Sequence, residues 1–301
     1  MTLDGPILCV DAGGTRCRGR LVAVDGAVLA EAAGGPCNPT TDPDRAAASL
    51  RGLWTDCAQA AGRDAAAAAQ VTLALGGAGL SVASARTALI AALPPFAGVL
   101  AMSDGYAALI GAAGGAPAGL IIAGTGVAAH RLFADGTSIE RDGWGWIGGD
   151  RGSGAWLGQR ALRHALAAAD GIVPGDALTD AVADALRHLA KEPRGWIPLL
   201  GPDRLAALAP LVLTAAGEGV ASARAIRDRG VAHLAALARA LELAETEPLF
   251  LAGGLAGTLR PLLAERLGRS VAAPARDALE GCRLVAIGAA PAERVRQEAR
   301  P

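Results

Sequence analysis

Two halves of this chain begin with the same succession: a short apolar strand, a glycine turn, a second strand, a hairpin turn and a third strand. In the first half the predicted strands cover 7–11, 19–24 and 28–33, with turns at Ala12-Gly13-Gly14-Thr15 and Asp25-Gly26. In the second half they cover 119–123, 127–133 and 137–142, with turns at Gly124-Thr125-Gly126 and Asp135-Gly136. This repeat predicts a duplicated domain with a cleft between the copies.

The rest of the pattern alternates helices and strands, which predicts an α/β protein with a mixed sheet and helices on its faces. Further strands are expected at 71–75, 98–102 and 248–252. Helices are expected at 43–62, 83–93, a segment ending near 113, 154–170, 176–190, 203–217, 220–243, 259–266 and 281–298. The linker-like Gly114-Gly115-Ala116-Pro117 divides the chain into predicted domains 1–115 and 116–301, with the last helix packing back on the first domain.

Composition narrows the classes of function. With 301 residues, 52% of them hydrophobic, the chain is expected to fold as two globular domains. A net charge of −1 does not supply the basic field of a nucleic-acid or polybasic membrane binder, and the abundance of arginine is interpreted as a composition bias. Five cysteines without a C-x-x-C pair, and an N-terminus without a basic leader, predict reduced thiols in a cytoplasmic protein. The longest uncharged stretch, 105–129, is broken by glycines and Pro117 and predicts no membrane span.

The glycine turns are suited to binding phosphate. Glycines let backbone N–H groups approach a phosphate closely, and the Thr15 hydroxyl adds a donor. Asp11, at the end of the first strand, could hold Mg²⁺ directly or through water. Gly253-Gly254 follows a later strand and could admit an adenine ring against the backbone. Each turn alone could be only a turn, but three at matching strand ends favour nucleotide binding. Neither a Walker-type P-loop nor a Rossmann glycine fingerprint is present.

The ordered set of motifs resembles the BadF/BadG/BcrA/BcrD ATPase family, in its N-acetylglucosamine and glucosamine kinase branch of the acetate and sugar kinase/heat-shock chaperone/actin superfamily. The resemblance rests on these segments, which cover most of the chain: 10–16, 36–39, 75–79, Ser103-Asp104, 123–126, Gly143-Trp144-Gly145, Gly148-Gly149-Asp150, Gly152-Ser153-Gly154 and 251–255. It implies two ribonuclease-H-like, actin-like ATPase domains, ATP and Mg²⁺ in the cleft, and an amino sugar phosphorylated on its 6-hydroxyl. A homodimer is the default expectation.

Residue by residue, the resemblance implies a catalytic base, two phosphate loops, an adenosine wall and a sugar pocket. Asp104 is the implied base. The implied cofactor-binding residues are Asp11 (also for Mg²⁺), Gly13, Gly14, Thr15, Arg16, Gly124, Thr125, Gly126, Gly253 and Gly254. The implied sugar ligands are Asn38, Gly77, Trp144 and Asp150. Two departures stand out: Ala12 replaces a common glycine, and Arg151 replaces a glutamate beside the expected sugar pocket, which leaves the exact substrate open.

Simpler structural roles compete with these assignments. Asp104 and Asp150 both precede predicted helices and could serve as helix caps, and Asn38 could be a turn residue. Trp144 could belong to a core or interface, and the four histidines lack ligand spacing. Two other functions also compete: an iron–sulfur ATPase that activates a dehydratase or reductase, and a sugar-binding regulator without catalysis. The first needs cysteine ligands, and the later half offers only Cys282.

Overall fold

The computed structural model describes residues 5–187, 193–195 and 197–296. They group into two compact units. Unit 1 comprises Met1–Ala118, His130–Ile139 and Pro274–Pro301, and unit 2 comprises Gly119–Ala129 and Glu140–Ala273. The predicted domains 1–115 and 116–301 differ from these units in where 116–118, 130–139 and 274–301 belong, and that division stays a prediction.

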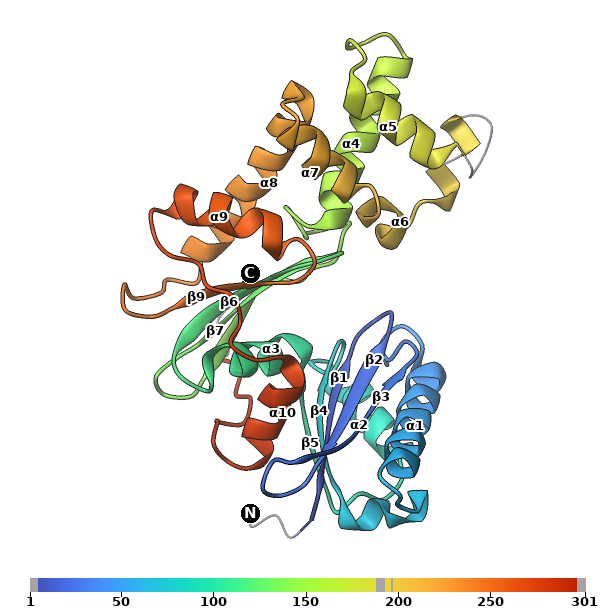
Figure 1. The fold of residues 1–301 in the computed structure, drawn as a ribbon, viewed down its shortest axis with the longest axis vertical. Coiled ribbons are helices and arrows are strands. Elements are labelled where there is room, and N and C mark those ends of the chain that lie inside the picture. The colour runs from blue at the N-terminus through green and yellow to red at the C-terminus, as the bar shows by residue number, and fades with distance from the viewer. Residues whose placement is uncertain (1–4, 188–192, 196, 297–301) are drawn as a thin grey trace. The chain divides into compact units, whose positions relative to one another are not determined.

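Unit 1 is built on a five-stranded sheet of order β3-β2-β1-β4-β5 (Figure 1). Its strands are β1 (Ile7–Ala12), β2 (Cys17–Val22), β3 (Val28–Gly34), β4 (Thr72–Gly77) and β5 (Gly98–Ser103). The first three are antiparallel, as the two tight turns predict, whereas β4 and β5 continue parallel to β1. Parallel pairing places the carboxyl ends of β1, β4 and β5 at one edge of the sheet.

Helices cover both faces of this sheet (Figure 1). One face carries α1 (Pro43–Ala60) and α2 (Ala83–Ala91), whose apolar side chains join Leu8, Val10 and Leu21 in one core. The opposite face carries α3 (Asp104–Ala113) and α10 (Ala278–Ala286), which pack against each other, with α10 also against β1 and β4. The short 3-10 helix at Ala65–Gln70 was not predicted.

Unit 2 contains most of a four-stranded sheet of order β8-β7-β6-β9. The strands are β6 (Ala118–Ala123), β7 (Val127–Leu132), β8 (Ser138–Asp142) and β9 (Leu249–Ala252), and β9 is parallel to β6. Its core joins β6 and β9 to α8 (Ala221–Arg239) and α9 (Ala256–Leu267). A second core is helical and joins α4 (Gly154–Ala169), α5 (Ala177–Leu186), α6 (Pro202–Ala206) and α7 (Ala209–Gly217).

The predicted α/β class with two sheets is confirmed, but several helix boundaries were wrong. The predicted helix 203–217 is two helices, α6 and α7, because Pro210 in the first turn of α7 has no N–H to continue the hydrogen-bond ladder. The predicted helix 220–243 ends at Arg239. The end of the predicted helix 176–190 lies outside the described residues.

The predicted last helix, 281–298, was the largest error. The helix is α10, and it ends at Ala286. Gly288 takes a left-handed φ of 73°, and Pro291 lacks an N–H, so neither can continue a helix. The following segment is extended instead, and Val295 forms a parallel bridge with Ser138.

Within the described residues, no single helix has the length and apolar composition to cross a membrane. The segments Pro202–Gly217 and Ala221–Arg239 satisfy that test only as a pair, across a bend of 114°.

Candidate active site

The carboxyl edge of the unit 1 sheet brings together three of the predicted site segments. The register pairs Ala12 with Gly77, and Gly77 with Ser103. The first glycine turn, Gly77 and Asp104 therefore follow neighbouring parallel strands. In open α/β sheets, ligands bind outside this end of the strands, because the loops there diverge.

The first glycine turn leaves its tip open. The Gly13 N–H donates to the Arg16 carbonyl at 2.9 Å, and the Gly13 carbonyl accepts from the Cys37 N–H at 2.9 Å. Gly14, Thr15 and Arg16 are exposed. A Cβ added to Gly14 would meet no atom within 4 Å. Backbone contacts thus hold the base of the turn, while its tip can receive a ligand.

Asp11 is held by an arginine that the sequence analysis did not select. On the neighbouring strand β2, Arg18 donates from Nη2 to Asp11 Oδ2 at 2.8 Å. Asp11 and Arg18 are direct partners in the β1–β2 register, so both side chains leave the same face of the sheet. Cross-strand spacing in the predicted hairpin was the only sequence signal for this pair.

Asp104 is not the cap of helix α3. The N-cap is Ser103, whose hydroxyl accepts a hydrogen bond from the Tyr106 N–H at 3.2 Å. Asp104 occupies the first helical turn and has an exposed surface. Desolvation nevertheless raises the pKa of its carboxyl above the ordinary value, and the charges of Asp11 and Glu293 raise it further, against a hydrogen bond from the Gly105 N–H. A carboxylate with a raised pKa accepts a proton more readily.

Two residues that sequence reasoning missed hold the start of α3. Glu293 accepts from the Ser103 N–H at 2.8 Å and from the Ser103 hydroxyl at 2.6 Å. His130, on β7, packs so closely on Gly105 that any Cβ there would overlap its ring. Glu293 lay inside the wrongly predicted last helix, and Gly288 and Pro291 were the available signals against that helix.

Unit 2 brings the second and third glycine turns to one end of its sheet. The carbonyls of Gly124 and Thr125 accept from the Gly154 and Ala155 N–H groups, at 2.8 and 3.1 Å. The Ala123 carbonyl accepts from the Leu255 N–H at 3.1 Å. The second glycine turn therefore lies between the first turn of α4 and the segment that leads into α9.

The glycines of these turns are of two kinds. Gly253 has a φ of 95°, and a Cβ there would overlap the Ala123 carbonyl, so the fold requires a glycine at this position. Gly126 packs against the Asp150 carboxylate. Gly124 and Gly254 have no atom within 4 Å of an added Cβ, so the space beside them is open to a ligand.

Asp150 supports the second glycine turn. It adopts a left-handed φ of 56°, and its buried carboxylate accepts from the Val127 N–H at 3.1 Å. Its own N–H donates to Asp142 Oδ1 at 3.0 Å. Burial raises the pKa of the Asp150 carboxyl, and the charge of Asp142 adds to this effect, against the Val127 hydrogen bond. Asp142 was not predicted as part of the site.

The other predicted sugar ligands lie at loops. Asn38 Oδ1 accepts from the N–H and hydroxyl of Thr40, at 3.0 and 2.7 Å, which is the turn role considered as its alternative. Its amide also lies against Gly79, in the loop after β4. In unit 2, Trp144 is 65% exposed and so does not belong to a core. Asn38 and Gly77 thus lie in unit 1, whereas Trp144 and Asp150 lie in unit 2.

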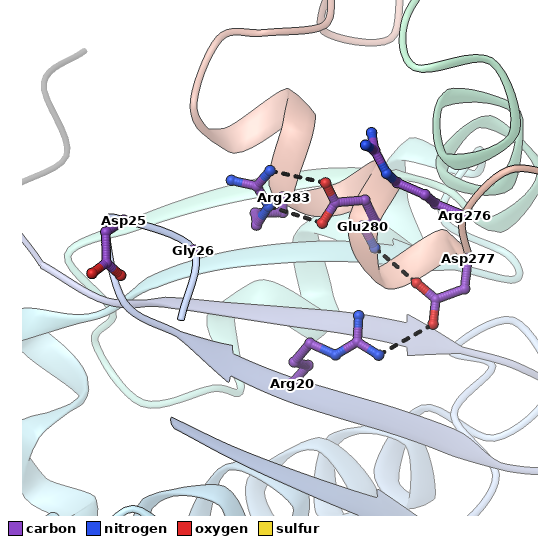
Figure 2. A pocket seen from close by; sticks show the side chains of 7 residues that line it. All are labelled: Arg20, Asp25, Gly26, Arg276, Asp277, Glu280 and Arg283. Carbon is purple, nitrogen blue, oxygen red and sulfur yellow. Dashed lines mark hydrogen bonds and ion pairs between the residues drawn. The ribbon is translucent and has the colours of Figure 1, made fainter. Parts of the chain in front are cut away.

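A separate pocket of about 480 Å³ lies in unit 1, between the β2–β3 turn and the start of α10 (Figure 2). Its charges are largely paired. Arg283 forms two hydrogen bonds with Glu280, both at 2.8 Å, and Arg20 contacts Asp277 at 3.4 Å. The pocket shares no lining residue with the glycine turns, and we interpret it as a structural ion-pair network.

The cysteines and possible metal ligands were also located. All five cysteines are buried free thiols. In the described ranges, no three His, Cys, Asp or Glu side chains are grouped to hold a metal.

Two sheets of this order, each with a glycine turn after its first parallel-paired strand, define the class as a two-domain, actin-like ATPase fold. A solved glucokinase of the ROK family from Streptomyces griseus, in complex with glucose and AMPPNP, shares this fold with a TM-score of 0.53 at 16% identity, over 95% of this chain and 98% of that one. The model of the BadF/BadG/BcrA/BcrD ATPase family matches residues 8–290, and the chain belongs to that family, as the motifs predicted.

Two relatives are similar over nearly the whole chain. Glucosamine kinase GspK of Vibrio cholerae serotype O1 is 27% identical over 277 residues, which cover 92% of this chain and 94% of the relative. A solved candidate N-acetylglucosamine kinase from Chromobacterium violaceum is 34% identical, with a TM-score of 0.87, over 93% of this chain and 98% of that one.

Proposed function

We propose that this protein is an ATP-dependent amino-sugar kinase that transfers the γ-phosphoryl group of ATP to the 6-hydroxyl of glucosamine or N-acetylglucosamine. The observation that carries this proposal is the position of Asp104. It follows β5 at the same sheet edge as the first glycine turn and Asp11, and Ser103 caps the helix in its place. The relative GspK, a glucosamine kinase, supports the substrate class.

In this proposal Asp104 acts as the general base. The attacking hydroxyl loses its proton as its oxygen bonds to the γ-phosphorus, and a carboxylate within hydrogen-bond reach both accepts that proton and aligns the oxygen. The backbone N–H groups at the tips of the first and second glycine turns bind the phosphates. The turn at Gly253-Gly254 receives the adenine ring. Asn38, Gly77, Trp144 and Asp150 are the proposed sugar contacts.

Asp11 fits a magnesium-assisted reaction. Mg²⁺ is usually bound by one or two carboxylates together with substrate phosphates and waters, and Asp11 offers a carboxylate beside the first glycine turn. Arg18 already occupies Asp11 Oδ2, which favours contact through a water molecule. Bound Mg²⁺ would neutralise charge on the transferring phosphoryl group.

The cysteine contacts argue against the iron–sulfur ATPase. Cys282 is fully buried, and its thiol donates to the Val10 carbonyl at 3.4 Å. Burial raises the pKa of this thiol, which disfavours the thiolate that an iron–sulfur cluster needs.

A coupled ADP-release assay over a panel of amino and neutral hexoses tests the proposal, with the position of the new phosphate read by NMR. We expect turnover with glucosamine or N-acetylglucosamine and a 6-phosphate product. Sugar-independent ADP release in every case would contradict the kinase assignment and favour an ATPase. A homodimer in the cytoplasm stays a prediction, which light scattering and cell fractionation can check.

A further inference from the structure

Unit 2 contains a pocket whose lining includes none of the residues proposed to bind ATP or the acceptor sugar. We call it the arginine pocket; it has a volume of about 460 Å³ and is lined by Trp146, Ile147, Gly148, Gly149, Arg151, Trp156, Gln159, Arg160 and Arg163. The lining comes from one face of α4 and from the loop before it. Pockets of this size typically hold small organic ligands. It shares no lining residue with the second or third glycine turn.

The charge of this pocket is not balanced. Three arginines line it, and none of the lining side chains is acidic. Within the described part of the chain, Arg151, Arg160 and Arg163 make no hydrogen bond or ion pair, and the Arg160 Nε atom is buried without a partner. The Arg160 side chain therefore has a donor that is free to bind an acceptor.

Neighbouring charges make the imbalance larger. Desolvation lowers the pKa of Arg160, and the charges of Arg163, Arg229 and Arg151 lower it further. His233 packs edge-on against Trp156. Its own desolvation lowers its pKa, and the positive charges of Arg151, Arg229 and Arg160 lower it further. Like charges held together cost free energy unless an anion binds among them.

Clustered arginine also occurs in the unit 1 pocket, but there acidic side chains lie among the arginines. The unit 1 pocket also contains three arginines, and there Arg20 and Arg283 are paired with Asp277 and Glu280 (Figure 2). The arginine pocket differs from it in having no acidic lining residue that could neutralise its three arginines.

The other lining side chains are suited to a sugar ring. The Arg160 guanidinium lies over the Trp156 ring, 5.1 Å from its centroid, and both residues line the pocket. Trp146 and Ile147 are 37% and 86% exposed, so apolar surface is available beside the cations. Gln159 adds an amide that can both donate to and accept from hydroxyl groups.

We propose that the arginine pocket binds a sugar phosphate, with the phosphate held by Arg160 and Arg163 and the ring against Trp146. Arginine guanidinium groups bind phosphate oxygens in pairs, and several unpaired ones suit a dianion. This inference rests on the proposed function only for the source of the ligand, because an amino-sugar kinase would itself make a sugar phosphate.

Occupancy of the arginine pocket has a consequence for the active site. Gly149 and Arg151 line the pocket, and Asp150 between them holds the Val127 N–H beside the second glycine turn. A bound sugar phosphate would therefore restrict the loop that supports this turn.

Calorimetric titration of the full-length protein with glucosamine 6-phosphate, without ATP, tests the proposal. We expect saturable binding that weakens about 10-fold or more in Arg163→Gln, because a hydrogen bond to a charged group is lost. Arg187→Gln is the matched control, since Arg187 is an exposed arginine of the same unit that pairs with Asp184. Its affinity should not change. Arg160→Gln serves as a second variant, with thermal melting as the folding control.

Three results would overturn the proposal: no saturable binding at millimolar concentration, equal affinity for inorganic phosphate, or displacement of the sugar phosphate by the free acceptor sugar. The last result would place the ligand in the acceptor site. The titration requires neither ATP nor turnover. Failure of the kinase assay therefore leaves this test readable, and an active kinase that does not bind sugar phosphate contradicts only the present inference.

Discussion

At the scale of single residues, Ser103 and Asp104 have different roles at the start of helix α3. Ser103 caps the helix and is itself held by Glu293 through two hydrogen bonds. Asp104 is thereby free for another role, although an aspartate at a helix start is more often a cap. The capping role that the sequence left open for Asp104 is thus performed by Ser103.

Replacing Asp104 by asparagine should separate catalysis from folding. Asparagine keeps the shape and an acceptor oxygen but cannot take the proton, so kcat should fall by roughly 10²–10⁴. Steady-state kinetics measures this loss. Thermal melting should show little change, whereas Ser103→Ala should lower stability by about 1 kcal/mol, because it removes the cap. An Asp104→Asn enzyme within about threefold of the wild-type kcat would exclude the base role.

The raised pKa of Asp104 should be visible in the pH dependence of the rate. The base acts only when it is ionised, so activity should fall as the pH drops through its pKa. Because desolvation and the charges of Asp11 and Glu293 raise that pKa, the fall should begin above the ordinary aspartate range. A profile of kcat/KM against pH checks this prediction. Removal of the Glu293 charge by Glu293→Gln should move the acidic limb to lower pH, and an unmoved limb would assign it to another group.

His130 should make the protein less stable in mild acid. Burial lowers its pKa from about 6.5 to about 4, so the unfolded chain binds the proton more readily than the folded protein. His130 alone should therefore lower the free energy of unfolding by about 3 kcal/mol as the pH drops from 7 to 4. Urea unfolding at several pH values measures it. His130→Gln should show a shallower pH dependence, and an identical slope would contradict this account.

At the scale of secondary-structure elements, the glycine turns contain glycines that the fold needs and glycines that only a bound ligand would need. Gly253 and Gly126 are needed by the fold, because Ala123 and Asp150 occupy the space where a side chain would lie. Gly14 and Gly124 face open space, so only a ligand would meet a side chain there. Glycines within these turns therefore have different physical roles, although they look alike in the sequence.

Valine at Gly14 or Gly124 should weaken ATP binding and leave the fold largely intact. The added side chain would hinder the approach of the phosphates to the turn, and its Cβ would meet no protein atom within 4 Å. Calorimetry with a non-hydrolysable ATP analogue measures the affinity. Gly201→Val is a matched control, because Gly201 also faces open space, at an extended φ of −102°. By contrast, Gly253→Ala should lower the melting temperature. Unchanged affinity in folded Gly124→Val would remove that turn from the site.

At the scale of the whole molecule, the chain passes from one unit to the other at 118/119 and returns for the last time at 273/274. A kinase that binds its substrates between two domains must exclude water from the γ-phosphate, and domain closure is the usual means. The linker-like Gly114–Pro117, which precedes the first of these passages, is the predicted hinge.

Sugar and nucleotide together should therefore make the molecule more compact. Small-angle scattering should show a smaller radius of gyration with the acceptor sugar and a non-hydrolysable ATP analogue than without ligands. Gly124→Val, which is expected to bind the nucleotide more weakly, should show a smaller change at the same ligand concentrations. A wild-type radius of gyration that does not respond to both ligands would contradict domain closure.

The sequence alone determined the local elements and their order. Hydrophobic periodicity and the chemistry of two-residue turns act over a few residues, so the hairpins of β1–β3 and the glycine turns at the strand ends were predictable. The parallel continuation to β4 and β5 then followed from the alternation of strands and helices. Because those strands run in parallel, Asp11, Gly77 and Asp104 arrive at one sheet edge.

Only the tertiary structure decided which side chains meet across long stretches of chain. Ser103 and Glu293 are 190 positions apart, and no local pattern links them. The close packing of His130 on Gly105 and the charge of the arginine pocket likewise depend on how separate elements pack. The last helix was overestimated for the same reason: a sequence window records apolar spacing, whereas the pairing of Val295 with Ser138 depends on a strand far away in the chain.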